Sequence, residues 1–561
     1  MYEEHLARLE RLKDPNRRIH CIWECEYRRL QKTPEYLIFE AETPRLVEPL
    51  QAREAFYGGR TNLLKFYHEA RENERIRYLD FTSLYPYVNK LKLYPIGSPV
   101  VILRAFLPLE NYVGFVKCKI LAPQDLYIPI LPFRANGKLL FPLCSKCALN
   151  RNKDVCTHNE NDRSLSGTWV IFEVIAALEK GYRMVEIFEV WNYPHTRCYE
   201  NNDMPIESED YDVHVETVRD DHTDVPEADI FAQLPNKDLF SGYINMFLKI
   251  KQECSGYPSD LNPSCDLCDN LDTCCHIDWV SLEQKRTEYI KVYKQHENIT
   301  LEANKISKNP GLRYVAKQCL VNLWGKFAEN TLERVQTVIL HDPTIFYDYL
   351  YDGTKNVKNI EILNDETVLV QYTDRECLVA SAPHVNVAIG AFTAAYGRMK
   401  LYEYLDRLND RVLYFDTDSI IFTETDNDTP VPVGIFLGEF TNEVPPDCRI
   451  LEYAATAPKS YGLKIQNIKT GEISYTLKSK GITFNHEVSQ RIEFQTLVDL
   501  VHNHSRKVKV TYPKAFHRNK VFVVSMKEKS KTLAFNYDKR VEINTSQQTI
   551  PYGFISKQKN E

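Results

Sequence analysis

The sequence predicts an α+β fold, because segments with the two-residue period of strands stand beside segments with helical spacing. Two apolar, β-prone runs, 412–415 and 420–422, flank an acidic tip, which is typical of a hairpin with buried arms. Apolar residues recur at helical spacing over 171–178, and residues 384–408 also have a helical pattern. Residues 331–380 alternate apolar and polar side chains between turn signals, which predicts a β-rich segment.

Length and composition place the chain in a broad class. It has 561 residues, of which 43% are hydrophobic, so it is long enough for several domains around a substantial core. A net charge of -7 argues against a generally basic protein that coats nucleic acid, although a locally positive groove remains compatible with it. We find neither a long apolar run nor a secretory signal after Met1, and we therefore expect an intracellular protein of the nucleus or cytoplasm. In such a compartment the 15 cysteines indicate thiols or metal ligands rather than disulfides.

Three acidic residues are the first candidates for chemistry. Asp416 and Asp418 lie at the hairpin tip, and two such carboxylates approach one cation only if the chain turns at Thr417. Asp80 ends a second strand-like run before a corner fixed by Pro86. Together they could supply the carboxylate oxygens for two Mg²⁺ ions that bridge a triphosphate. The alternative for Asp416 and Asp418 is an ordinary solvated turn.

Several stretches resemble the motifs of one enzyme family. The segments 80–86, 317–325 and 414–419 resemble motifs A, B and C of family B DNA polymerases, and the likeness is greatest to the protein-primed branch of phage, linear plasmids and Polinton/Maverick-type mobile elements. Segment 56–59 resembles the family's Tyr-x-Gly-Gly linker, segment 459–461 its Lys-x-Tyr motif, and 94–97 has a Polinton-like sequence. These motifs occur in the family's order over residues 56–484. The resemblance implies a right-hand polymerase with palm, fingers, thumb and inserted TPR-like subdomains.

The resemblance also implies a division of the chain into segments. They are an N-terminal linker to a missing exonuclease half (1–55), a palm segment with motif A (56–104), a Cys-rich insertion with a candidate terminal-protein-binding subdomain (105–300), a fingers helix with motif B (301–330), the β-rich insertion (331–380), a palm segment with motif C (381–465) and a thumb with a basic tail (466–561). We therefore expect the polymerase half of a longer protein, without an exonuclease domain.

Residue roles follow from the matched motifs. Asp80, Asp416 and Asp418 are implied to be catalytic and, with Phe81, to form the Mg²⁺ site. Nucleotide binding is implied for Tyr85, Arg313, Lys317, Asn322 and Trp324. DNA binding is implied for Phe56, Gly58, Gly59, Thr417, Lys459 and Tyr461.

Two of these roles have a direct physical reason. An aromatic ring at Tyr85 beneath the nucleotide sugar would leave no space for a 2′-hydroxyl and would select deoxynucleotides. The alternatives are a core tyrosine or an RNA-synthesising enzyme that lacks this discrimination. Lys317 would neutralise the incoming phosphates, whereas a lone lysine on a helix is ordinarily a solvated residue.

The match departs from the family at the fingers helix. The family pattern is Lys-x-x-x-Asn-Ser-x-Tyr-Gly, and this chain has Val321 and Asn322 in place of the Asn-Ser pair and Trp324 in place of the tyrosine. Valine cannot donate a hydrogen bond, so a contact to the nucleotide is lost or is made by Asn322 instead. Trp324 keeps a stacking surface. This departure leaves open a catalytically silent, DNA-binding remnant as the alternative function.

Two cysteine clusters have the spacing of zinc sites. The first is Cys144, Cys147, Cys156 and His158, whose four soft ligands suit a tetrahedral ion, although small buried cysteines are also common in cores. The second is less regular and comprises Cys265, Cys268, Cys274 and His276, with Cys254 as a candidate extra ligand. We expect structural Zn²⁺ at the first cluster more than at the second.

Charge patterns indicate where partners bind. Residues 200–229 are densely acidic and would be held away from DNA, whereas residues 506–531 carry nine basic side chains against one acid and would grip a duplex. A merely solubilising tail is the alternative for the basic segment. The expected partners are primer-template DNA, deoxynucleoside triphosphates and a terminal priming protein, with no membrane. The predicted function is template-directed DNA synthesis.

Overall fold

The computed structural model describes residues 22, 24–36, 48–197, 239–262, 278–330, 335–374, 385–518, 524–543 and 547–556. The chain divides into two compact units, Met1–Pro49 and Leu50–Glu561. The first contains helix α2 (Glu24–Leu30), and everything below concerns the second. Among the described helices, none combines the length and the apolar character that a membrane span requires.

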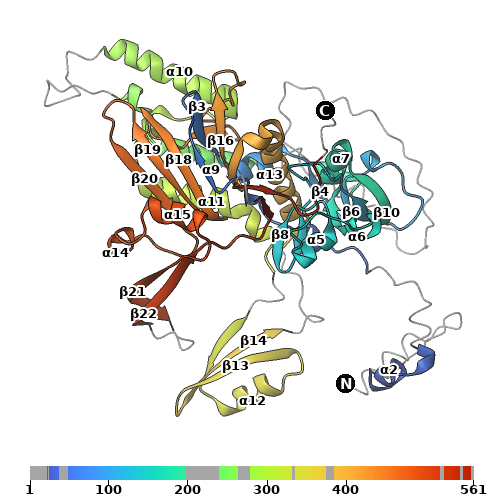
Figure 1. The fold of residues 1–561 in the computed structure, drawn as a ribbon. Coiled ribbons are helices and arrows are strands. Elements are labelled where there is room, and N and C mark those ends of the chain that lie inside the picture. Colours follow the sequence, from blue (N-terminus) through green and yellow to red (C-terminus); the bar gives the residue numbers. More distant parts are fainter. Residues whose placement is uncertain are drawn as a thin grey trace. The chain divides into compact units, whose positions relative to one another are not determined.

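One large antiparallel sheet carries the three acids and the residues just after them (Figure 1), whereas the segment 317–325 lies on a helix. In the described part of the chain it has nine strands, with the order β1-β15-β16-β3-β18-β19-β20, while β17 pairs with β3 and β2 with β18. The strands are β1 (Thr61–Leu63), β2 (Tyr67–Glu69), β3 (Glu74–Phe81), β15 (Val412–Asp416), β16 (Ser419–Thr425), β17 (Phe440–Asn442), β18 (Cys448–Ala457), β19 (Ser460–Asn467) and β20 (Ile473–Lys478). Among its pairings, those of β1 with β15, β16 with β3 and β18 with β3 join segments hundreds of residues apart.

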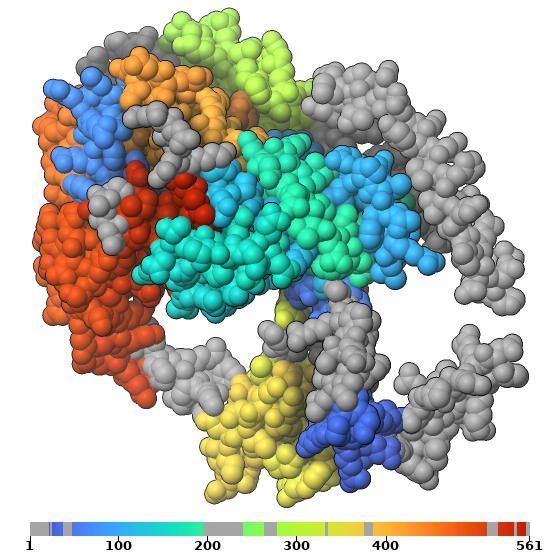
Figure 2. Space-filling model, turned by 45° about the vertical axis from the view of Figure 1, so that its right-hand side comes forward, coloured from blue at the N-terminus to red at the C-terminus, as the bar shows by residue number. Residues whose placement is uncertain are grey.

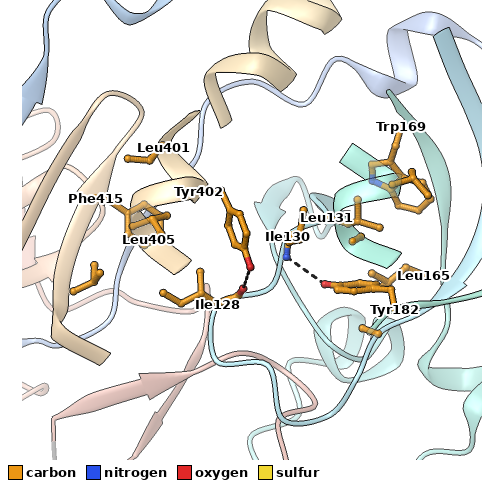
Figure 3. Packing of buried hydrophobic residues seen from close by; sticks show 14 of the residues in the cluster. Ile128, Ile130, Leu131, Leu165, Trp169, Tyr182, Leu401, Tyr402, Leu405 and Phe415 are labelled. Atoms are coloured by element: carbon orange, nitrogen blue, oxygen red, sulfur yellow. Dashed lines mark hydrogen bonds between the residues drawn. The ribbon is translucent and has the colours of Figure 1, made fainter. Parts of the chain in front are cut away.

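Both faces of the sheet are buried under other parts of the chain, because the central strands carry apolar side chains on both faces. One face packs Leu79, Phe415 and Ile420 against helices α4 (Leu84–Leu91) and α13 (Val387–Leu408). Figure 3 shows part of this core, in which the Tyr402 hydroxyl donates to the carbonyl of Ile128 at 3.3 Å and the backbone N–H of Ile130 donates to the Tyr182 hydroxyl at 3.3 Å. The other face buries a separate cluster of side chains, among them Tyr78, Ile421 and Tyr453. This double burial holds the central strands rigidly.

A second antiparallel sheet lies between the first strands of the large sheet and helix α9 (Ser241–Glu253) in the chain order. Its order is β5-β10-β6-β9, and helix α7 follows β9 directly. Its elements, with the small pairs that flank it, are β4 (Tyr94–Ile96), β5 (Val100–Ile102), β6 (Gly114–Leu121), β7 (Phe133–Ala135), β8 (Lys138–Leu140), α5 (Ser145–Asn150), α6 (Glu160–Arg163), β9 (Leu165–Val170), α7 (Ile171–Glu179), β10 (Arg183–Asn192) and β11 (His195–Arg197).

Among the described residues 239–262 and 278–330, most of the structure is helical. The α-helices there are α9 (Ser241–Glu253), α10 (Trp279–Glu297) and α11 (Pro310–Phe327). Helix α11 begins at Pro310, since the Asn309 side chain accepts from the Leu312 N–H and Pro310 occupies the first turn. Helices α9 and α11 pack against each other, so their charged residues are brought together.

The segment after α11 forms a small module. It consists of the sheet β12-β14-β13 and one helix, with β12 (Gln336–Leu340), α12 (Pro343–Tyr351), β13 (Lys355–Asn364) and β14 (Thr367–Asp374). The strands agree with the predicted β-rich segment. Helix α12 was not predicted, and it forms because the Asp342 side chain caps the N–H of Thr344 and Pro343 occupies the first turn.

The C-terminal region leaves the large sheet and then returns to it. Its elements are α14 (His486–Ser489), α15 (Phe494–His502), the long hairpin β21 (Lys507–Arg518) and β22 (Val524–Ala534), and the short hairpin β23 (Val541–Ile543) and β24 (Gln548–Ile550). After β22 the chain runs back along β1, where the Thr549 N–H donates to the Leu64 carbonyl at 2.8 Å. The sequence contains no sign of this return.

Other predicted elements have the expected form. The hairpin at 412–422 is β15 and β16, the helical spacing over 171–178 is α7, and the pattern over 384–408 is α13 from Val387 onward. The acidic run 200–229 and the second cysteine cluster, Cys265, Cys268, Cys274 and His276, lie outside the described residues.

Candidate active site

The three predicted carboxylates meet at one end of the large sheet. Asp416 ends β15, Asp418 lies in the turn before β16, and Asp80 on β3 is in register with Ser419. The Phe81 N–H donates to the carbonyl of Asp418 at 2.7 Å, which ties the two strands together beside the acids. Because neighbouring strands lie about 4.8 Å apart, this register places Asp80 next to Asp418. The convergence on which the sequence prediction depends is therefore present.

The hairpin turns at Thr417, as its position between the two acids requires. Thr417 has a φ of 61°, and its N–H donates to the Arg60 carbonyl at 2.7 Å. A left-handed conformation is unfavourable for a β-branched residue, so the surrounding contacts must hold it. One such contact comes from Gly59, where an added Cβ would lie 2.8 Å from the Thr417 hydroxyl. The glycine loop and the acidic turn are thus packed directly on each other.

Replacement of Gly59 by alanine is a test of this packing. We expect Gly59→Ala to displace Thr417 and to lower the free energy of unfolding by about 1–3 kcal/mol, since the added methyl has no room. Denaturant unfolding of the purified chain measures this loss. Gly242→Ala on α9 is the matched control, because nothing lies within 4 Å of the added Cβ and alanine favours a helix. Equal stabilities of the two variants would contradict the packing described here.

Asp416 is surrounded by hydrogen-bond donors. Its Oδ1 accepts from the Thr61 hydroxyl at 2.7 Å and lies 3.3 Å from the Lys459 ammonium. The Tyr414 hydroxyl donates to its Oδ2 at 3.4 Å and accepts from the Lys459 N–H at 3.0 Å. These contacts fix the orientation of the Asp416 carboxylate.

The other two acids are destabilised as carboxylates. Burial raises the pKa of Asp80 to about 7, and repulsion from Asp418 and Glu443 adds to this effect. Burial and repulsion from Asp416 also raise the pKa of Asp418. The acidic site therefore carries more negative charge than the nearby cations Lys317 and Lys478 neutralise.

A cationic surface lies beside the acids on the two packed helices. Lys317 and Arg313 line a cavity of about 440 Å³, and the Arg313 Nε donates to the Ser255 hydroxyl at 3.0 Å. Lys251 on α9 adds a third cation, which donates to the Ser83 hydroxyl at 3.2 Å. Burial, with repulsion from Arg313 and Lys317, lowers the pKa of Lys251 to about 8. Three mutually repelling cations beside a cavity favour a bound anion.

Tyr85 lies between this cationic surface and the acidic turn. Its ring packs on Trp324 with a centroid distance of 4.4 Å, and the two residues line a cavity of about 500 Å³ with Val321 and Asn322. A Cβ added at Gly397 would lie 3.0 Å from the Tyr85 ring, so helix α13 supports it from behind. Asn322 binds Gln318 of its own helix at 3.3 Å through its side-chain amide.

The predicted DNA-binding residues occupy several environments. Gly58 has a φ of 85°, and its carbonyl accepts from Arg398, whose guanidinium also pairs with Glu173 at 2.7 Å in the interior. The Phe56 ring lies 6.1 Å from that of Trp324. Tyr461 is only 4% exposed, and its hydroxyl lies 3.0 Å from that of Tyr78. Its surroundings are therefore protein rather than open surface, in contrast to the more exposed Lys459.

The basic C-terminal segment forms the hairpin β21–β22. Of its described side chains, Lys509 lies opposite Thr532, Lys531 opposite Val510 and Lys529 opposite Tyr512. A long two-stranded ribbon that carries repeated lysines presents them along one extended element.

Several residues of this site carry no sequence signal. Thr61, Lys251, Arg398 and Glu443 belong to none of the motifs and reach the site only through the fold. The Ser-Leu-Tyr-Pro corner after Asp80 was the nearest available clue for Lys251, since its partner Ser83 lies within it.

Comparisons with known proteins give one family match and several structural likenesses. Residues 36–202 match the family model described as DNA polymerase type B, organellar and viral. A search of curated proteins found no match. The chain is similar to Phi29 DNA polymerase in an orthorhombic crystal form, with 14% identity, a TM-score of 0.47 and coverage of 86% of this chain and 62% of that chain. It therefore spans less than two thirds of the chain in that structure.

Two further solved structures are similar to the chain. They are Phi29 DNA polymerase complexed with primer-template DNA, at 15% identity, a TM-score of 0.46 and coverage of 89% and 65%, and the same polymerase with primer-template DNA and incoming nucleotides, at 14% identity, a TM-score of 0.47 and coverage of 95% and 78%.

Proposed function

We propose that the chain is a DNA-directed DNA polymerase that adds deoxynucleotides to a primer 3′-hydroxyl. The observation that carries this proposal is the meeting of Asp80, Asp416 and Asp418 at the end of one rigid sheet, beside three cations on α9 and α11. The match of residues 36–202 to the type B polymerase model supports it. We accordingly assign the large sheet as the palm. The packed helices α9 and α11 would belong to the fingers, and the β21–β22 hairpin to the thumb.

The acidic cluster fits divalent metal ions. Asp80 and Asp418 are held near each other with raised pKa values, so a cation between them would relieve a repulsion that the protein leaves in place. Carboxylate oxygens are the ligands that Mg²⁺ prefers, and the Phe81 backbone is the expected additional ligand. When bound there, two ions would activate the primer hydroxyl and stabilise charge on the leaving pyrophosphate.

The residues of the chain itself then position the reactants. Lys317, Arg313 and Lys251 bind the triphosphate and offset its charge, and anion binding favours the protonated form of Lys251. Thr61 and Tyr414 hold the Asp416 carboxylate in orientation. Tyr85, packed on Trp324, forms the floor beneath the sugar. Lys459 is free to exchange its partner Asp416 for a primer phosphate when DNA enters.

The wider biology is proposed from the motif resemblance. Protein-primed replication of a mobile element or virus, with a terminal protein as the primer, fits the branch that the motifs resemble. The lysines of β21–β22 would contact the duplex, so binding should weaken steeply as salt rises.

Primer extension by the purified chain tests the function. With Mg²⁺, a labelled primer-template and deoxynucleoside triphosphates, we expect template-directed extension that stops when a chelator is added. Loss of extension in Asp416→Ala would show that the activity belongs to this chain. Duplex binding without incorporation by the wild-type protein would instead favour the silent remnant suggested by Val321.

A further inference from the structure

The first cysteine cluster forms a compact site away from the acids. Cys144, Cys147 and Cys156 are buried, and His158 is half-buried beside them. Their four ligand atoms lie within 4.8 Å of one another. The sulfurs of all three are thiols in the structure, so no disulfide occupies the site.

The distances match a tetrahedral zinc site. The His158 Nδ1 lies 3.5, 3.2 and 3.6 Å from the sulfurs of Cys144, Cys147 and Cys156. Zinc bonds of about 2.3 Å to sulfur and about 2.0–2.1 Å to nitrogen place two such ligands about 3.6 Å apart in a tetrahedron. One histidine nitrogen near-equidistant from three sulfurs is the arrangement that an ion between them requires.

The backbone around the cluster supports thiolate ligands. Cys144 caps helix α5, and its sulfur accepts from the Cys147 N–H at 3.3 Å, while the Asn152 amide lies 3.7 Å from the Cys147 sulfur. Such N–H···S contacts stabilise negative charge on sulfur and hold the ligands in place. Two of the predicted sulfur ligands therefore also have N–H groups beside them that would stabilise their negative charge.

The described parts of the returning C-terminal segment, residues 537–543 and 547–556, pack on this cluster. The Leu143 N–H donates to the Tyr552 carbonyl at 2.8 Å, and Tyr552 and Val541 share a small apolar core with the three cysteines. Gly553 has a φ of 88°, and a Cβ there would lie 2.4 Å from the Cβ of Cys144. Figure 2 shows the red C-terminal atoms beside the teal segment that contains the cluster.

The same segment also covers the edge strand of the large sheet. The Thr549 hydroxyl donates to the Leu63 carbonyl at 3.0 Å, the Tyr537 hydroxyl to the Asn62 side chain at 2.6 Å, and the Lys539 ammonium to the Thr61 carbonyl at 2.9 Å. Strand β1 in turn pairs with β15, with Thr61 in register with Asp416. A continuous chain of contacts thus runs from the cysteine cluster to the Asp416 carboxylate.

We propose that Cys144, Cys147, Cys156 and His158 bind one Zn²⁺ and that this ion holds residues 537–543 and 547–556 against β1. A closed four-ligand zinc site contributes folding energy directly, so it would add to the small apolar core and to the hydrogen bonds with β1 that hold the segment. The zinc thereby acts as a structural clamp that positions Thr61 and Lys539 beside Asp416. This inference stands whether or not the chain polymerises DNA.

Metal analysis of the full chain tests the ion. We expect Cys144→Ser and His158→Ala each to lose one zinc per chain relative to wild type, while Cys448→Ser, a half-buried cysteine outside the cluster, loses none. The difference between variant and wild type is the readout, so a second metal elsewhere in the chain does not affect it. Cobalt substitution of wild type should give the spectrum of a tetrahedral, sulfur-rich site. Unchanged zinc content in both variants, or a disulfide between Cys144 and Cys147 in the purified protein, would overturn the site.

Hydrogen exchange tests the clamp. Removal of zinc from the wild-type chain should speed exchange at the Thr549 and Leu143 amides by about tenfold or more, because their acceptors belong to the clamped contact. Amides of the β18–β19 pair should be unaffected, and re-addition of zinc should restore protection. Zinc loss without faster exchange at Thr549 would refute the clamp, and general loss of protection would assign the ion to global stability instead.

Discussion

Replacement of Asp80 by asparagine is expected to abolish nucleotide incorporation and at the same time to stabilise the metal-free protein. Loss of one carboxylate ligand should lower the incorporation rate by a factor on the order of 10³ or more. The gain in stability follows from the raised pKa of Asp80, which is about 7 in the folded chain against an ordinary value of 3.8. Function and stability therefore place opposite demands on this residue.

The pH dependence of that gain has a definite sign. The folded protein holds the Asp80 proton more tightly than the unfolded chain does. Below about pH 4 the residue is protonated in both states, so its ionisation does not lower the free energy of unfolding. Between about pH 4 and pH 7 the ionisation of Asp80 lowers the free energy of unfolding progressively. A rise from 3.8 to about 7 corresponds to at most about 4 kcal/mol, and screening at this half-buried site lowers the expected gain to about 1–2 kcal/mol. Asparagine has no such titration, so Asp80→Asn should be more stable than wild type at pH 8 and equal to it near pH 4.

Denaturant unfolding with a chelator present measures this difference. Asp426→Asn is the matched control, because Asp426 follows the same hairpin but is exposed and paired with Arg75. It should leave incorporation unchanged. Addition of Mg²⁺ should stabilise wild type more than Asp80→Asn. If Asp80→Asn is less stable than wild type at pH 8, the ionised Asp80 carboxylate does not destabilise the fold, and the raised pKa described above is wrong.

Replacement of Tyr85 by valine is expected to remove discrimination against ribonucleotides. The ring of Tyr85 packs against Trp324, with 4.4 Å between the ring centroids. Gly397 and Gly59 leave room for it, since a Cβ at Gly397 would lie 3.0 Å from the Tyr85 ring and a Cβ at Gly59 would lie 3.1 Å from its hydroxyl. Removal of the ring opens space beneath the sugar, so the ratio of ribonucleotide to deoxynucleotide incorporation should rise on the order of 10²-fold. Deoxynucleotide incorporation should change far less.

Single-nucleotide incorporation kinetics with matched ribo- and deoxynucleotides measure this ratio. Tyr85→Phe keeps the ring and should keep the wild-type preference, which separates the bulk of the ring from its hydroxyl. A wild-type enzyme that prefers ribonucleotides would contradict the role of Tyr85 and favour an RNA-synthesising enzyme. An unchanged ratio in Tyr85→Val would show that another group excludes the 2′-hydroxyl.

Local patterns predicted the elements that carry the site. The apolar arms of the hairpin, the helical pattern over 384–408 and the four soft ligands between 144 and 158 were all recognisable from residue type and spacing. Such features depend on neighbours within a few residues, which the sequence states directly. Helix α12 was missed because a single Asp-Pro start was outweighed by the surrounding alternation of apolar residues.

Long-range partners could not be predicted in this way. Thr61 and Asp416 are 355 residues apart, and the Lys251 ammonium reaches Ser83 across 168. The buried placement of Tyr461 also arises from its partner Tyr78, on another strand of the sheet. No periodicity or spacing encodes these contacts.

The sequence by itself determined which groups are available for chemistry: three acids at strand ends, a cationic helix and a cluster of soft metal ligands. Only the tertiary structure brings the three acids into one site, where the pKa values of Asp80 and Asp418 are raised, and joins the cysteine cluster through the C-terminal segment to the edge strand beside Asp416. The physical reason is that residue type sets what a side chain can do, whereas strand register and burial set its neighbours and hence its charge.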